Sequence, residues 1–155
     1  MILPGCKDTL RASLERLYSE ARLQFQQGYT YQSQESAAKG ERDSHDLPDL
    51  NWEFRDLQAE IFTRNNKPGD AERILAPLPP DSASFDVFWR RKLVLAWAAC
   101  QLHNYPEADR YLSEAEQLSA NRVGLRAELA YFRGRCEIVK NNLQTAEAYF
   151  QQVLN

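Results

Sequence analysis

The stretch AACQLHNYPEADRYL (residues 98–112) contains both halves of the pattern that decides the fold. An apolar segment ends at His103, a short polar break containing Asn104 and Pro106 follows, and a second amphipathic segment begins. Asparagine is typical of helix ends, and proline is tolerated in the first turn of a helix. The stretch therefore predicts a hairpin of two α-helices.

The same pattern recurs at intervals of 37 to 38 residues. A small residue lies in the first helical segment of each of four units, and a second small residue follows twelve positions later. The first set is Ala21, Ala59, Ala96 and Gly134, and the second set is Ser33, Ala71, Ala108 and Ala146. Two helices approach closely only where small side chains face each other, because a larger residue forces them apart. We expect these residues to pack the helices of each unit together.

The repeat predicts an all-α fold, a right-handed solenoid of four helical hairpins with about eight helices. A single domain should span residues 1–155, with units at about 8–45, 49–79, 82–119 and 121–155. Asp8 and Thr9 are favourable N-cap residues, so we expect the first helix to begin near them, after a disordered start.

Two stretches, GRCEIVKNNLQTAEAYF (134–150) and AACQLHNYPEADRYL, resemble the tetratricopeptide repeat. That family has Gly or Ala in the middle of the first helix, Ala twelve residues later and a large apolar residue four further on. The unit around Ala59 is similar, whereas Ser33 and Ala37 depart from the pattern in the first unit. Because the family period is about 34 residues, the resemblance implies longer linkers between hairpins, or longer helices, in this chain.

The segments WEFRDLQAEIF (52–62) and YFRGRCEIVKNNLQTAEAYFQQVL (131–154), with an APLPP linker, also resemble the N-terminal helical arrays of CHAT-group proteins. These bacterial proteins carry a caspase-like C-terminal domain. The resemblance implies that the chain belongs to a longer protein, in which it acts as the regulatory or sensing arm of a protease. The catalytic His and Cys of that group belong to a domain outside this sequence.

The first helix of each pair lines the concave side of a helix-pair solenoid. The repeat register places the following candidate partner-binding residues there: Tyr18, Arg22, Glu60, Trp97, Tyr131 and Arg135. Aromatic residues beside arginine are typical of binding hot spots. They predict a scaffold that binds a protein or peptide in its concave groove. The alternative is that Trp97 and Tyr131 pack between neighbouring hairpins.

No motif in the sequence points to catalysis, a cofactor or a metal. Cys100 and His103 could be neighbours on a helix face, but no third orienting group accompanies them. The six glycines form no phosphate-binding motif, and no cluster of His, Cys or acidic residues has metal-ligand spacing. We therefore predict a protein that is not an enzyme and needs no cofactor or metal.

The charge and hydropathy of the sequence argue against two classes of partner, nucleic acids and membranes. The net charge is −3, and the longest basic block is RRK (90–92), so we expect no binding of nucleic acid. The longest apolar run, LVLAWAAC (93–100), is far shorter than the ~20 residues that span a bilayer. Direct membrane insertion is therefore not expected, and the sequence as given predicts a cytoplasmic protein.

The stretch LPGC (3–6) resembles a bacterial lipoprotein processing site, with Cys6 as the candidate lipidated residue. Such a site needs a basic and apolar signal segment, of which only MILPG is present. If a signal segment precedes Met1, the resemblance implies a membrane-anchored lipoprotein. Cys100 and Cys136 lie in apolar helical segments, and the three cysteines are widely spaced. We expect both to be free thiols packed as small hydrophobes.

The last helical segment, LQTAEAYFQQVL (143–154), carries apolar side chains with no capping helix after it in this sequence. The end of a solenoid normally has a polar cap that covers the apolar face of its last repeat. We therefore expect that the protein continues or that this face forms a homodimer. Self-association through the C-terminal helix is a further functional alternative.

Overall fold

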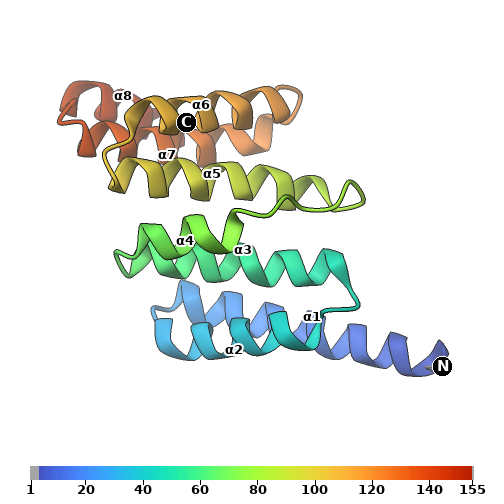
Figure 1. Cartoon of the computed structure of the whole chain (residues 1–155). Coiled ribbons are helices and arrows are strands. Elements are labelled where there is room, and N and C mark those ends of the chain that lie inside the picture. Colours follow the sequence, from blue (N-terminus) through green and yellow to red (C-terminus); the bar gives the residue numbers. More distant parts are fainter. Residues whose placement is uncertain (1–3, 155) are drawn as a thin grey trace.

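The computed structural model describes the backbone of residues 4–154 and the side chains of residues 8–154. This part of the chain contains eight α-helices, one 3₁₀-helix and no β-strand, which confirms the all-α class (Figure 1). The helices are α1 (Pro4–Gln26), α2 (Thr30–Asp43), α3 (Pro48–Arg64), α4 (Pro68–Leu75), α5 (Phe85–Gln101), α6 (Tyr105–Leu118), η1 (Val123–Leu125), α7 (Arg126–Val139) and α8 (Leu143–Leu154). α1 begins at Pro4, so the expected start near Asp8 and Thr9 was wrong.

Consecutive helices pair into four hairpins, α1–α2, α3–α4, α5–α6 and α7–α8, which stack in chain order (Figure 1). The first helices α1, α3, α5 and α7 contact one another in series, and each hairpin contacts only its neighbours in the sequence. Nearest-neighbour packing of this kind is what a repeat array produces. The right-handed sense of the stack and the tetratricopeptide identity stay predictions.

All four hairpin turns have the same backbone conformation. Gly28, Asn66, His103 and Asn141 each have a positive φ, between 56° and 86°, at the corresponding position of their turns. The next N–H bonds a carbonyl five residues back, as in Asn104 N to Ala99 O at 2.9 Å and Asn142 N to Glu137 O at 2.8 Å. This is the Schellman type of helix ending, which favours glycine and asparagine. His103 is therefore a turn residue, and its Nδ1 lies 2.7 Å from the Tyr105 hydroxyl.

The sequence repeat of this chain is longer than the tetratricopeptide repeat, for two different structural reasons. In the first repeat the helices are long, with 23 residues in α1 and 14 in α2, and the linker to α3 is short. In the second repeat α4 has only 8 residues, and the irregular segment 76–84, which includes a turn, leads to α5. The third repeat uses the segment 119–125, which contains η1. Longer helices and longer linkers both occur, in different units.

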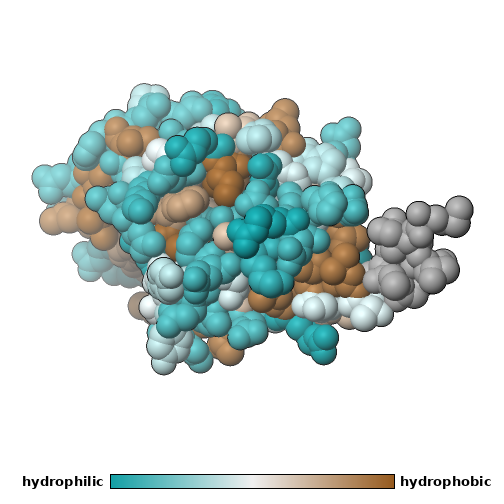
Figure 2. All heavy atoms as spheres, turned by 60° about the horizontal axis from the view of Figure 1, so that its bottom comes forward, coloured by the Kyte–Doolittle hydropathy of each residue, from teal (hydrophilic) through white to brown (hydrophobic). Residues whose placement is uncertain are grey.

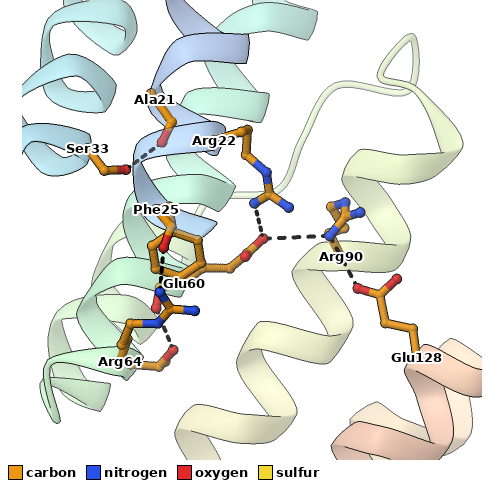
Figure 3. A network of polar contacts seen from close by, with 9 residues as sticks. Ala21, Arg22, Phe25, Ser33, Glu60, Arg64, Arg90 and Glu128 are labelled. Atoms are coloured by element: carbon orange, nitrogen blue, oxygen red, sulfur yellow. Dashed lines mark hydrogen bonds and ion pairs between the residues drawn. The ribbon is translucent and has the colours of Figure 1, made fainter. Parts of the chain in front are cut away.

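The small residues of the repeat lie at the contacts between paired helices. Ala21, Ala59, Ala71, Ala96, Ala108, Gly134 and Ala146 are all buried. A Cβ on Gly134 would lie 2.6 Å from the Phe150 ring, so the helices α7 and α8 approach most closely there. In the first hairpin Ser33 replaces alanine, and its buried hydroxyl donates to the carbonyl of Ala21 at 2.8 Å (Figure 3). The serine thus fits the contact because its polar group has a partner.

A disulfide joins Cys100 in α5 to Cys136 in α7. The expectation that both residues are free thiols was therefore wrong. Their Cα atoms are 5.7 Å apart, and both side chains are fully buried. The two cysteines are 36 residues apart and so do not occupy equivalent repeat positions. They meet because adjacent first helices pack side by side. The side chain of Cys6, the candidate lipidation site, lies outside the described residues.

The surface at the first-hairpin end of the stack is mainly hydrophilic, with separate hydrophobic patches between the polar side chains (Figure 2). Leu10 and Leu23 are exposed apolar residues of α1. Single apolar side chains of this kind are normal on protein surfaces. Among the described residues, no helix is both long and apolar enough to cross a membrane.

We predict that Gly40→Ala destabilises the first two hairpins. Gly40 in α2 is buried against Phe54 of α3, and a Cβ there would overlap the fully buried Phe54 ring. The free energy of unfolding should fall by about 1–3 kcal/mol, the usual cost of overpacking. The control is Gly69→Ala in α4, where a Cβ meets nothing. That change should leave stability equal or raise it by about 0.5 kcal/mol. Urea denaturation measures both, and equal effects at the two sites would refute the close approach.

We also predict that reduction of the disulfide weakens the array. Closing the loop between Cys100 and Cys136 should contribute about 4 kcal/mol to the free energy of unfolding. Guanidinium denaturation with and without reductant measures the difference, with Cys6→Ser as the control that leaves the disulfide intact. Alkylation of the denatured, unreduced chain should label Cys6 alone, and labelling of all three cysteines would contradict the pairing.

Candidate partner-binding groove

The four first helices together form one side-chain pocket of about 270 Å³, here called the groove. Every residue that lines it belongs to α1, α3, α5 or α7. It brings together most of the candidate residues that the sequence placed on the concave side: Arg22, Glu60, Trp97, Tyr131 and Arg135. The repeat register thus collects side chains from positions 22 to 135 on one surface.

Tyr18 is the one candidate residue that does not line the groove. Its ring packs edge-to-face on Phe54, with ring centroids 5.4 Å apart. Burial raises the pKa of Tyr18 to about 12, although the nearby charge of Arg22 lowers it. Tyr18 is therefore a neutral phenol that fills the space between the first two hairpins.

A chain of alternating charges crosses the groove from α1 to α7 (Figure 3). Arg22 donates to Glu60 at 2.8 Å, Arg90 lies 3.8 Å from the same carboxylate, and Arg90 donates to Glu128 at 3.3 Å. Each residue comes from the next first helix in the stack. The ion pairs therefore link all four hairpins across the floor of the groove.

Arg22 is the most closely paired member of this chain. Burial lowers the pKa of its guanidinium, but the charge of Glu60 and the hydrogen bond to it raise the pKa, and the net change is upward. Most of both side chains is removed from water, with 20% of Arg22 and 14% of Glu60 exposed. Partly buried, hydrogen-bonded pairs of this kind are screened by salt less than surface pairs are.

Two further arginines of the groove stack on aromatic rings. The Arg64 guanidinium carbon lies 3.6 Å from the centre of the Phe25 ring, and Arg64 also donates to the Phe25 carbonyl at 2.6 Å. The Arg135 guanidinium carbon lies 3.8 Å from the Trp97 ring centre. Such stacking holds a guanidinium in place and leaves its edge N–H groups available as donors.

Asp56 is a buried carboxyl in the middle of α3, at the repeat position that Leu93 occupies in α5. Neither of its oxygens has a hydrogen-bond partner among the described residues. Burial raises its pKa well above the ordinary value, the charges of Glu60 and Glu53 raise it further, and Arg90 and Arg91 lower it. Burial therefore makes the charged form of this carboxyl less favourable in the folded protein than in the unfolded chain.

The cysteines with described side chains are bonded to each other, and both histidines are exposed. No group of three or more His, Cys, Asp or Glu side chains is placed to hold a metal ion there. The Sγ atom of Cys100 is bonded to Cys136. His45 is exposed, and its ring lies 3.2 Å from Asp46. The two histidines therefore belong to surface turns.

Sequence reasoning did not select Phe25 and Arg64 for the groove, although both line it. Their spacing from the selected residues could have indicated that they line the groove. Arg64 lies four residues after Glu60, and Phe25 lies three residues after Arg22. Residues three or four apart share one face of a helix. The groove thus extends one helical turn beyond the positions that the repeat pattern marks.

Comparison of the chain with protein-family models, with curated proteins and with solved structures found no match. The resemblances to tetratricopeptide arrays and to the CHAT group therefore stay predictions from sequence motifs.

We predict that Asp56→Asn stabilises the protein at pH 8 by about 1–3 kcal/mol, because it removes the need to bury an unpaired carboxylate. The folded-state pKa of Asp56 lies above its unfolded value of 3.8. Folding therefore takes up a proton, and the free energy of unfolding falls as the pH rises from 3.8 through the folded pKa. The variant should lose this part of the pH dependence. Thermal unfolding between pH 4 and pH 8 measures this pH dependence. The control is Asp81→Asn, a substitution at an exposed position. A lower stability of Asp56→Asn than of the unaltered chain at pH 8 would refute the account.

Proposed function

We propose that this chain is a protein-interaction scaffold that binds a peptide segment of a partner in the groove. The observation that carries the proposal is the composition of the groove wall, which takes residues from the first helices of all four hairpins. A segment lying across them would contact every repeat at once. Repeat arrays use their extended concave surfaces for such recognition.

The chemistry of the wall also supports recognition of a peptide. A volume of about 270 Å³ is on the scale of a few amino-acid side chains, so it suits an extended segment better than a folded domain. Tyr131 is 44% exposed, and Trp97 lies beside it under Arg135. Tyr, Trp and Arg are the residues that most often dominate binding energy at interfaces.

Self-association through the last hairpin is a second candidate, favoured by a specific exposed surface. Ile138 and Leu143 are 50% and 63% exposed. In the repeat register Ile138 corresponds to Cys100, Thr63 and Phe25, which are buried against the following hairpin. The outer face of α7 and α8 is thus apolar where the inner repeats are covered. The protease-arm hypothesis gains no comparable observation and stays a prediction from the sequence.

The disulfide bears on the cellular location. Buried disulfides persist in oxidising compartments and are rare in the cytosol. The Cys100–Cys136 bond therefore favours an oxidising compartment over the cytoplasm, and the membrane-anchored alternative is one way to reach it. Whether Cys6 is modified stays a prediction.

Selection of peptides on the chain tests the proposal. Random nine-residue peptides displayed on phage should yield binders whose affinity falls at least about 10-fold with Tyr131→Ala, the usual effect of removing a hot-spot residue. The matched control is Tyr31→Ala, an exposed tyrosine of α2 outside the groove, which should leave the affinity within about twofold. Fluorescence anisotropy with the selected peptides measures both.

Two outcomes would contradict groove binding. If the selected peptides bind the Tyr131→Ala variant as tightly as they bind the unaltered chain, the binding surface lies outside the groove. A failure to select any peptide, combined with a mass in sedimentation equilibrium that rises with concentration, would favour self-association through α7 and α8 instead.

A further inference from the structure

The groove has an excess of positive charge, although the whole chain has a net charge of −3. Four arginines and two glutamates line it: Arg22, Arg64, Arg90, Arg135, Glu60 and Glu128. Both carboxylates are already engaged, Glu60 with Arg22 and Arg90, and Glu128 with Arg90. The two unbalanced positive charges therefore belong to Arg64 and Arg135.

Arg64 and Arg135 both line the groove, and their positive charges repel each other. Burial lowers the pKa of Arg135, and the positive charge of Arg64 lowers it further, while Tyr131 raises it. Among residues 8–154, no carboxylate lies within ion-pair distance of either guanidinium. Because the two positive charges repel each other in the same groove, an added anion would relieve the repulsion.

The aromatic contacts hold both side chains in position for such an anion. Arg64 is fixed by the Phe25 ring and the Phe25 carbonyl, and Arg135 lies over Trp97 with the Tyr131 ring centre 5.5 Å away. A stacked guanidinium loses little additional freedom on binding, and its planar fork matches the oxygens of a carboxylate or phosphate.

We propose that Arg64 and Arg135 form a subsite for an oxyanion carried on the bound peptide, either a Glu or Asp carboxylate or the phosphate of a phosphorylated side chain. This inference rests on the proposed function, because the peptide supplies the anion. It names the class of partner: a segment with an acidic or phosphorylated residue beside an apolar one. The anion would meet the guanidiniums and the apolar residue would meet the exposed Tyr131, whereas Trp97 is buried and packs under Arg135.

A peptide fits the groove better than a nucleic acid does. The positive charge is local, and the carboxylates of Glu60 and Glu128 lie in the same wall. Binding of a nucleic-acid strand relies on a basic strip that follows several phosphates in succession. The groove offers only one pair of unbalanced arginines, because the other charges in its wall are already paired.

The test uses the full chain and three degenerate peptide pools on an array. The pools have the same random flanking residues and differ only at a fixed central position, which is Glu, phosphoserine or Gln. We expect the Glu or the phosphoserine pool to bind at least about 10-fold more tightly than the Gln pool, the effect of one charge-assisted contact. The tighter of the two anionic pools identifies the source of the oxyanion.

Variants of the chain assign the preference to this site. Arg135→Gln should reduce the preference for the anionic pool to within about twofold, whereas Arg135→Lys, which keeps the charge, should retain part of it. Arg73→Gln is the matched control, because Arg73 is an exposed arginine of α4 whose loss changes the net charge equally. Circular dichroism checks that each variant folds. If Arg135→Gln does not fold, Arg64→Gln at an exposed position replaces it.

The outcomes separate this inference from the proposed function. Equal binding of the Gln and anionic pools, with all of them lost in Tyr131→Ala, would overturn the oxyanion subsite and leave the groove function standing. An absence of binding to every pool would overturn both. Displacement of the anionic pool by oligothymidylate at lower concentration than by free peptide would assign the subsite to nucleic acid and overturn the proposal.

Discussion

The architecture depends on one constraint, the close approach of the two helices in each hairpin at small residues. Ala21, Ala59, Ala96 and Gly134 fix this contact in the four first helices. The residue that follows each of them points about 100° further round the helix and cannot face the second helix as well. These following residues are Arg22, Glu60, Trp97 and Arg135, and all of them line the groove. The packing contact thereby sets which side chains the groove receives.

The groove divides into a paired half and an unpaired half. The alternating chain from Arg22 to Glu128 satisfies its own charges and links the hairpins. Arg64 and Arg135 are held by aromatic rings instead, which position a cation without neutralising it. A network of paired charges and a surface with two unpaired arginines thus lie side by side in the groove. The two halves differ because Arg22 and Arg90 have a carboxylate partner on a neighbouring first helix, whereas Arg64 and Arg135 have none among the described residues.

The helical period and the small residues predicted the all-α class, the hairpins and most of the groove, because these features repeat and a register can be read from one sequence. The remaining features do not repeat. The disulfide joins non-equivalent positions, so no spacing rule pointed to it. Arg64 lies at the end of α3, one turn beyond the conspicuous positions. Asp56 lies where a neighbouring repeat has Leu93, and only the packed structure establishes that its carboxyl is buried without a partner.

The disulfide and the candidate oxyanion subsite lie on the same two helices. Cys100 follows Trp97 by three residues in α5, and Cys136 directly follows Arg135 in α7. The covalent bond therefore fixes the separation of the helices that bring Arg135 over the Trp97 ring. A guanidinium that is already in place costs less ordering on binding, and this preorganisation favours affinity. The Cys100–Cys136 bond therefore holds in place the same two helices that carry the proposed oxyanion subsite.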